Sequence, residues 1–209
     1  MKTYIFDYNG TIIDDVGIAV ECENLMLAER GLPHGYTLKQ YQDMFSVPME
    51  DYYRKIGYTF ENETFADVAE EFTRLYAERF SKTELCEGAM ELLEKINNSE
   101  DECVILSSCH EPLLIQQCSQ LGISSYFKKI MGTDDCLAGS KTDIARKWLN
   151  EEGIRSEDCV YFGDTLADYE TAKQIGVDNI ILVSSGHQSY ERLRKVCPAT
   201  IHSLKEYIL

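Results

Sequence analysis

The chain has 209 residues and a net charge of −16 at pH 7, with 36 acidic and 20 basic side chains. Its length allows one sizeable core, or one core with a smaller appended unit. The negative charge repels nucleic-acid phosphates and anionic lipid, so we expect neither as a partner. No apolar run approaches the roughly 18 residues of a membrane span, and the start turns polar by residue 7, which predicts a cytoplasmic protein without a signal segment.

The first predicted strand, residues 2–6, is followed by a long stretch without a convincing second strand. From about residue 16 to residue 82 the apolar residues recur at helical spacing. A crossover between parallel strands needs only one helix, and this stretch holds several. We therefore expect a small helical domain, 16–82, inserted into a core made of 1–15 and 83–209.

Two apolar stripes run along this helical stretch. One joins Ile18, Cys22, Leu25 and Met26, and the other is an aromatic-rich stripe over 65–80. Aromatic side chains at helical spacing can line a cofactor site, but they more often pack a core. We interpret both stripes as core packing against partner helices.

Strand-like runs return in the second half of the chain and alternate with helical patterns from about residue 87 to the end. This alternation predicts an α/β fold, a Rossmann-like parallel sheet between two helical layers. The predicted later strands are 102–107, 126–132, 158–163 and 179–184.

Eight cysteines are present without a C-x-x-C pair, so we expect reduced, mostly buried thiols and no zinc site.

Polar side chains follow the ends of several predicted strands. Ligands of open parallel sheets bind at the carboxyl ends of the strands, so these side chains are expected to converge on one edge. They comprise three carboxylates, hydroxyl groups and a lysine near the start of a helix. The residues are Asp7, Ser107, Ser108, Lys141, Asp164 and Asp168.

This combination suits phosphoryl transfer. Carboxylates can hold Mg²⁺, which prefers oxygen ligands, and the metal and Lys141 would bring positive charge to a phosphoryl group. A carboxylate such as Asp7 can then attack phosphorus and form an aspartyl-phosphate. Gly10 would let backbone N–H groups approach the phosphoryl oxygens, and the hydroxyls of Thr11 and Ser107 would add donors.

Four ordered segments carry a family resemblance. They are "DYNGT" (7–11), "VILSS" (104–108), Lys141 before a helix, and "YFGDTLADYETAKQIG" (161–176). With them the chain resembles the phosphohydrolases of the haloacid dehalogenase superfamily, in the branch of phosphoglycolate phosphatase and β-phosphoglucomutase, which carry a helical cap. Two departures are Asn9, where that family has Asp, and "KTD", where its third motif usually continues Lys-Pro.

The resemblance implies a role for each residue. Asp7 is the expected nucleophile and a Mg²⁺ ligand, together with the backbone carbonyl of Asn9, and Asp164 and Asp168 bind the ion or orient its waters. Ser107 and Lys141 hold the phosphoryl group. The implied substrate is a small phosphorylated metabolite resembling phosphoglycolate, and the implied assembly is a monomer or homodimer. The implied substrate-binding set is Gly10, Thr11, Ser107, Ser108 and Lys141.

Asn9 leaves the mechanism open. In the family, the carboxylate at this position protonates the leaving group, and an amide cannot carry that proton. General acid–base help is typically worth about 10²–10⁴ in rate. Three alternatives remain: a phosphatase that uses water, another acid or a leaving group that needs no proton; a phosphate-binding protein with little turnover; or a phosphonatase-like hydrolase with a Schiff-base lysine, Lys39 or Lys55.

Several nearby polar residues receive a plainer interpretation. Asp14 and Asp15 precede a helix and are expected to act as N-cap and hinge residues. His110 and His187 follow strand ends without an evident acidic partner, and we interpret them as loop residues near the mouth of the site. Arg54 or Lys55, in the cap turn, could meet a substrate anion, although solvated surface is the simpler expectation.

Overall fold

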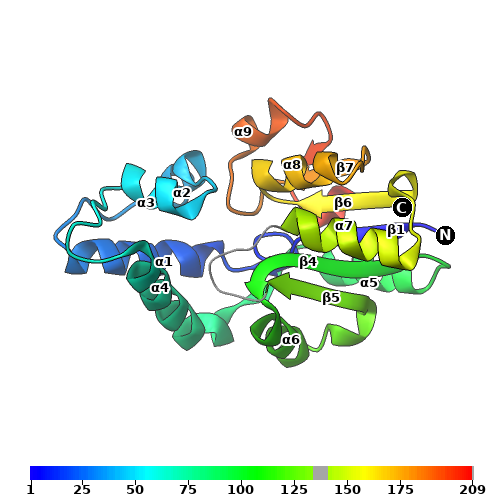
Figure 1. Ribbon diagram of the computed structural model, residues 1–209, viewed down its shortest axis with the longest axis horizontal. Helices are drawn as coiled ribbons and strands as arrows, with labels where there is room; N and C mark the ends of the chain where they lie inside the picture. Colours follow the sequence, from blue (N-terminus) through cyan, green and yellow to red (C-terminus); the bar gives the residue numbers. More distant parts are fainter. Residues whose placement is uncertain (134–140, 209) are drawn as a thin grey trace.

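A computed structural model describes residues 1–133 and 141–208 of the chain. Its main sheet has six parallel strands in the spatial order β5-β4-β1-β6-β7-β8 (Figure 1). The five predicted strands are confirmed, and a short sixth strand, β8, was not predicted. The strands are β1 (Thr3–Phe6), β4 (Glu102–His110), β5 (Phe127–Thr133), β6 (Cys159–Gly163), β7 (Ile180–Val183) and β8 (Thr200–Ile201).

Helices cover both faces of this sheet, which confirms the predicted three-layer α/β fold. Alternate residues of β1 divide between two apolar clusters, with Phe6 facing one and Ile5 the other. The Phe6 side is covered by α5 (Ala89–Asn97) and α6 (Glu111–Gln120). The Ile5 side is covered by α7 (Lys141–Glu152), α8 (Leu166–Gln174) and α9 (Tyr190–Arg194).

Four α-helices occupy residues 16–79, which we call the four-helix segment. They lie beyond one end of the sheet, at the left of Figure 1. A short antiparallel pair, β2 (Ile13–Asp14) with β3 (Glu84–Leu85), joins the segment to the sheet. The helices are α1 (Val16–Glu29), α2 (Leu38–Met44), α3 (Met49–Lys55) and α4 (Phe65–Arg79).

Capping residues in the sequence mark the starts of two of these helices. Thr37 caps α2 and Thr64 caps α4, each in a reciprocal capping box with the residue three positions on. The interpretation of the stripes as core holds in part. Ile18, Cys22 and Met26 are buried, but Leu25 is 38% exposed, at the edge of the stripe. Phe72, in the aromatic stripe, lines a cavity described below.

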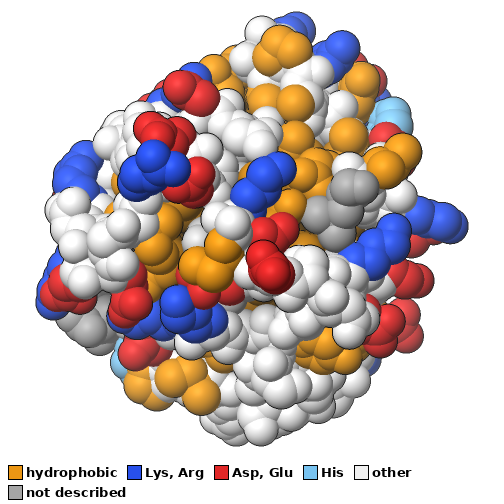
Figure 2. Space-filling model, turned by 90° about the vertical axis from the view of Figure 1, so that its right-hand side faces the viewer, with side chains coloured by type: hydrophobic (Ala, Val, Ile, Leu, Met, Phe, Trp, Pro, Cys, Tyr) orange, Lys and Arg blue, Asp and Glu red, His pale blue; other side chains and the backbone are white. Residues whose placement is uncertain are grey.

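Short 3₁₀ helices complete the described chain at Phe80–Lys82, Ser124–Tyr126, Ser156–Asp158 and Leu204–Glu206. Figure 2 shows the end of the core that lies away from the four-helix segment, where acidic and basic side chains are interspersed. The seven cysteines in the described residues are free thiols, and Cys136 lies outside them. Within residues 1–133 and 141–208, no helix is long and apolar enough to cross a membrane.

Candidate active site

The order of the strands brings the predicted site residues to one edge of the sheet. β1 lies between β4 and β6, and Phe6 is in register with both Ile105 and Phe162. The chain continues in that register for one residue, because Asp7 N donates to Phe162 O over 2.8 Å. Asp7 therefore lies between the ends of the strands that carry Ser107 and Asp164, as expected from the sequence.

Three carboxylates gather at this edge. Asp7, Asp164 and Asp168 are buried, and each offers an oxygen within 4.8 Å of the other two. Lys141, the first residue of α7, reaches into the cluster. Its Nζ donates to Asp7 Oδ1 and, over 2.8 Å, to Asp168 Oδ1. Charge from three separate segments of the chain is thus concentrated in one place.

The electrostatics of the cluster show an excess of negative charge. Burial raises the pKa of Asp7 to about 7, although Lys141 opposes this, and burial also raises the pKa of Asp164 well above its usual range. Burial disfavours ionised Asp168 as well, but Lys141 outweighs that effect and lowers its pKa. One ammonium faces three carboxylates, so the donor set fits a hard divalent cation such as Mg²⁺.

The oxygens of Asp168 are already engaged by protein groups. Oδ2 accepts from Thr165 N over 3.1 Å and from Thr165 Oγ1 over 2.5 Å, forming the capping box that starts α8. Oδ1 accepts from Lys141 and, over 3.3 Å, from Tyr161 OH. Asp168 therefore fixes both the start of α8 and the position of Lys141.

Asp164 is held between two glycines. A Cβ placed on Gly10 would lie 2.9 Å from Asp164 Cγ, and one on Gly186 would lie 2.6 Å from the same atom. Gly10 also has a φ of +70°, which disfavours residues with a side chain. The Gly10 N–H donates to Ile13 O and to Asp15 Oδ1, both over 2.9 Å. The Gly10 N–H is thus used within the protein, and the expectation that other backbone N–H groups of the turn cradle phosphoryl oxygens stays a prediction.

The predicted hydroxyl groups differ in their surroundings. Thr11 Oγ1 is buried and has no hydrogen-bond partner among the described residues. Ser107 is also buried, and its Oγ accepts from Cys109 N over 3.1 Å. Ser108 is exposed and lines the cavity described below. Thr11 and Ser107 therefore lie within the folded core next to the cluster's strands, whereas Ser108 faces open space.

Asn9 belongs to a hydrogen-bond network that the sequence did not reveal. Its Nδ2 donates to Asp15 Oδ2 over 2.7 Å and to Tyr76 OH over 3.2 Å. Tyr76 OH in turn donates to Asp15 Oδ2 over 2.8 Å. Asp15 stands at the N-cap position of α1, but its side chain makes no capping hydrogen bond. Asp15 therefore occupies the predicted N-cap position, but its side chain does not cap the helix, because its carboxylate turns back to the glycine turn.

His187 also has an acidic partner, contrary to the expectation from the sequence. Its Nε2 lies 3.4 Å from Asp15 Oδ1, and Tyr41 OH is hydrogen-bonded to its Nδ1 over 2.7 Å. Burial lowers the pKa of His187, but Asp15 outweighs burial and raises it to about 9. The His187 backbone N–H donates to Asp164 Oδ2 over 2.5 Å. The signal available was its place after a strand, the same signal that pointed to Asp164.

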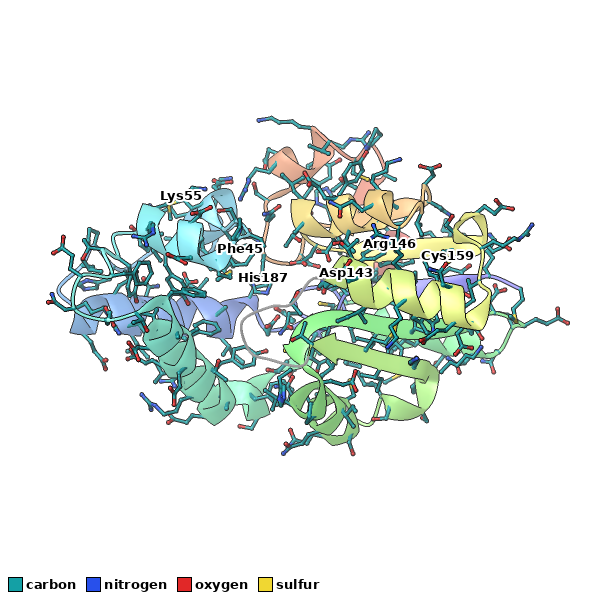
Figure 3. The ribbon with its side chains drawn as sticks, viewed as in Figure 1. Phe45, Lys55, Asp143, Arg146, Cys159 and His187 are labelled. Carbon is teal, nitrogen blue, oxygen red and sulfur yellow. The ribbon has the colours of Figure 1, made fainter. Side chains whose placement is uncertain are left out.

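A cavity of about 280 Å³ opens beside this network, between the sheet and the four-helix segment. Asn9 and Asp15 line it at the sheet end, and Glu23, Phe45 and Phe72 line it on the helical side. Phe45 and His187 lie together where the two parts meet (Figure 3). The arrangement offers a carboxylate cluster for a metal and a phosphoryl group, next to a chamber for the rest of a small molecule.

The two lysines considered for a Schiff base, Lys39 and Lys55, lie in the four-helix segment and do not line this cavity. Lys55 Nζ donates to Ser46 Oγ over 3.0 Å, and in Figure 3 it lies on α3, away from Phe45 and His187. Lys39 Nζ lies 3.3 Å from Asp43 Oδ2, and its side chain is 73% exposed. Among the described residues that line the cavity, no lysine or arginine occurs.

Known proteins share this architecture. A haloacid dehalogenase-like family hydrolase from Streptococcus pneumoniae superposes with a TM-score of 0.79 at 19% identity, over 96% of this chain and 93% of that one. CbbY from Rhodobacter sphaeroides, solved in complex with phosphate, superposes with a TM-score of 0.74 at 17% identity, over 99% and 96% of the two chains. These similarities establish the fold.

Sequence comparison leads to the same group of proteins. Phosphoglycolate phosphatase 1 of Pseudomonas aeruginosa is 25% identical over 183 residues, which span 84% of this chain and 67% of that protein. Phosphoglycolate phosphatase of Pseudomonas fluorescens is 24% identical over 96% of this chain and 75% of its own length. Residues 4–182 match the haloacid dehalogenase-like hydrolase family, and the chain therefore belongs to that family.

Proposed function

We propose that the protein is a Mg²⁺-dependent phosphatase that hydrolyses a small phosphorylated metabolite through an aspartyl-phosphate on Asp7. The observation that carries the proposal is the cluster of three buried carboxylates around Lys141 at the carboxyl edge of the sheet. The names of the phosphoglycolate phosphatases among its relatives support the same reaction class. The family alone allows several hydrolytic reactions, so the cluster gives the proposal its chemistry.

The metal would be held by carboxylates of this cluster. Asp7 and Asp164 are the proposed ligands, with the backbone carbonyl of Asn9, and Asp168 would orient the waters of the ion. When bound, the ion supplies positive charge that screens the substrate phosphoryl group from the carboxylates. The excess of buried negative charge around Lys141 supports this assignment.

The protein residues would carry out the transfer in two steps. A carboxylate oxygen of Asp7 attacks phosphorus, and the bond from phosphorus to the leaving oxygen breaks, with its electron pair departing on that oxygen. Water then attacks the same phosphorus, and the bond between phosphorus and the Asp7 oxygen breaks. Its electron pair returns to Asp7 as a carboxylate, and inorganic phosphate leaves with the protons of that water. Lys141, fixed by Asp168, would stabilise the phosphoryl oxygens, and the Ser107 hydroxyl would add a donor.

We also propose that the four-helix segment is a cap domain, as expected for residues 16–82. Its side chains and those of the sheet edge line one cavity together. A cap that closes over the edge would exclude water during the first step and admit it for the second. We further propose a cytoplasmic location, which the free thiols of the described cysteines favour.

A phosphate-binding protein with little turnover is the second candidate, and Asn9 favours it. The Asn9 amide donates to Asp15 and Tyr76 and has no proton to give to a leaving alkoxide. A leaving group that departs as an anion, such as that of an acyl phosphate, would remove this obstacle. A phosphonatase-like reaction has less support, because Lys39 and Lys55 do not line the cavity.

Phosphate release from a panel of compounds tests these alternatives. The panel contains p-nitrophenyl phosphate, acetyl phosphate, alkyl phosphates and phosphonoacetaldehyde, each with Mg²⁺ and with EDTA. Mg²⁺-dependent release from phosphates supports the phosphatase. Mg²⁺-dependent binding of vanadate without release from any compound supports the binding protein. Release from the phosphonate alone would contradict both, as would the absence of release and of binding.

A further inference from the structure

The cavity beside the carboxylate cluster has a composition that bears on the substrate. Its described lining holds no lysine or arginine. The residues outside the described part, 134–140 and 209, contain none in their sequence either. The two histidines of the lining are His110 and His187, and His187 is paired with the carboxylate of Asp15. A second anionic group on a substrate, such as the carboxylate of phosphoglycolate, would therefore enter the cavity without a lysine or arginine partner.

The helical wall of the cavity presents a buried carboxyl group. Glu23, on α1, is 3% exposed, and its Oε2 accepts from Tyr52 OH over 2.7 Å. No other hydrogen bond or ion pair of Glu23 is found among the described residues. Burial raises the pKa of Glu23 to about 7, and the Tyr52 hydrogen bond and the charge of His187 oppose this effect only in part. A buried acid without an ion-pair partner is costly, and a positively charged ligand would offset that cost.

Aromatic rings surround the same space. Tyr41, Phe45, Tyr53, Phe72 and Tyr76 all line the cavity, on α2, α3, α4 and the residue after α2. Ring faces attract ammonium groups, and several rings together with a carboxylate form the usual receptor for substituted ammonium ions. The cavity volume of about 280 Å³ is at the lower end of ligand pockets, which suits a small alcohol.

Resting on the proposed phosphatase function, we propose that the substrate is the phosphate monoester of an amino alcohol, whose ammonium group occupies the aromatic cavity against Glu23. The phosphoryl group would lie at the Asp7 cluster and the cationic end would reach the helical wall. This arrangement pairs each charge of the substrate with an opposite charge of the protein. It disfavours substrates whose leaving alcohol carries a carboxylate.

Three esters separate charge from shape. Phosphocholine carries a trimethylammonium group, 3,3-dimethylbutyl phosphate has the same shape without the charge, and phosphoglycolate carries an anion instead. We expect kcat/KM for phosphocholine to exceed that for the neutral ester by about tenfold, the order of a desolvated cation–π contact. We expect phosphoglycolate to be the poorest of the three. Equal values for the first two, or the highest value for phosphoglycolate, would overturn the inference.

A charge-neutral variant assigns the preference to Glu23. Glu23→Gln keeps an acceptor for Tyr52 and should lower the ratio of phosphocholine to 3,3-dimethylbutyl phosphate, while the aromatic rings that remain should keep it above one. Glu29→Gln, on an exposed position of the same helix, should leave the wild-type ratio in place. An unchanged ratio in Glu23→Gln would contradict the inference. Release of p-nitrophenol from p-nitrophenyl phosphate tests the phosphatase proposal separately, because it does not depend on a cationic alcohol.

Discussion

Asn9 Nδ2 donates a hydrogen bond to Asp15 Oδ2 over 2.7 Å, so an amide and a carboxylate share the space beside the proposed nucleophile. The family motif that this chain resembles has a carboxylate in the place of Asn9. In this chain, the carboxylate that is hydrogen-bonded to position 9 belongs to Asp15, at the start of α1. It is neutralised by His187 and held by Tyr76 and by Gly10 N. The carboxylic acid that the family motif has at position 9 is therefore absent. The neighbouring Asp15 carboxylate is held by four groups of the protein: Asn9, His187, Tyr76 and the Gly10 N–H.

Replacing Asn9 with Asp is expected to supply the missing acid. The new carboxyl group would lie beside Asp15, and two carboxylates this close hold a proton between them because both cannot ionise. Turnover of alkyl phosphates should rise by up to about 10²-fold, the low end of general acid–base help. Aryl phosphates should gain much less, because their leaving groups depart as anions. The measurement is kcat/KM over a series of esters of falling leaving-group pKa.

The role of Asp15 in that effect is tested by a double-mutant cycle. In Asp15→Asn the partner that retains the proton is gone, so adding Asn9→Asp should give a smaller gain than it gives in the wild type. The leaving-group dependence should flatten in Asn9→Asp and stay steep in wild type. Parallel lines for those two proteins would show that Asn9 does not mark a missing acid.

Asp7→Asn is expected to abolish phosphate release while the fold is retained. The amide cannot attack phosphorus, and at this buried position it is close in size to the carboxylate. Unfolding by urea should remain cooperative, and the urea concentration at its midpoint should rise, because a buried negative charge is removed from the cluster. The assay is phosphate release under single-turnover conditions. More than a few per cent of wild-type turnover would point to another nucleophile.

The fold could be predicted well because its signals are local. β1 and β6 are apolar runs whose lengths exclude helices, and the alternation after residue 87 requires a parallel sheet. β8 was missed because two residues, Thr200–Ile201, carry no periodicity. Leu25 was wrongly expected in the core. It lies at the edge of an apolar stripe, and the sequence does not show whether a neighbouring helix covers a residue at such an edge.

The carboxylates of the site could be predicted from one rule, that ligands bind at the carboxyl ends of parallel strands. Asp7 and Asp164 follow strand ends, so the parallel sheet itself brings them together. The pairing of Asp15 with His187 could not be predicted, because the two residues are far apart in the sequence and no motif links them. Asp15 also stands where a helix cap is expected, and that local signal suggested a role its side chain does not have. Glu23 gave no signal, because an acid inside a helical pattern usually faces solvent.

Glu23 is expected to make the metal-free protein less stable as the pH rises. Its pKa is about 7 in the folded state against an ordinary value of 4.5, so between these pH values the folded chain keeps a proton that the unfolded chain has released. The stabilisation is complete below pH 4.5 and is lost as the pH rises to about 7, by up to about 3 kcal/mol from 1.36 kcal/mol per pKa unit. Urea unfolding from pH 4.5 to 8 measures it.

Comparison with Glu23→Gln isolates this contribution from that of the acids in the cluster. The titratable groups around Glu23 are Cys22, Tyr41, Tyr52, Tyr53, Tyr58 and His187, and the variant retains them all. The free energy of unfolding of Glu23→Gln should fall less between pH 4.5 and 7 than that of the wild type. Identical pH dependence in both proteins would mean that Glu23 ionises in the fold as it does in the unfolded chain.

Gly10→Ala is expected to damage the carboxylate cluster, and Gly31→Ala provides the matched control. Both glycines have left-handed backbones, with φ of +70° and +65°, so both substitutions carry the same backbone cost of about 1 kcal/mol. Nothing lies within 4 Å of a Cβ on Gly31, whereas a Cβ on Gly10 would meet Asp164 Cγ at 2.9 Å and His187 Cδ2 at 2.8 Å. The extra loss of stability at Gly10 measures this close approach, and it should add about 1–3 kcal/mol, as overpacking does.

The same pair of variants separates stability from metal binding. Asp164 cannot keep its place against a methyl group on Gly10, because Gly186 closes off the other side. Calorimetry with Mg²⁺ should therefore show weaker binding, by tenfold or more, in Gly10→Ala and unchanged binding in Gly31→Ala. Equal loss of stability in the two variants with wild-type Mg²⁺ affinity would mean that the turn after Asp7 yields to a side chain, and that the glycine is needed for its backbone angle alone.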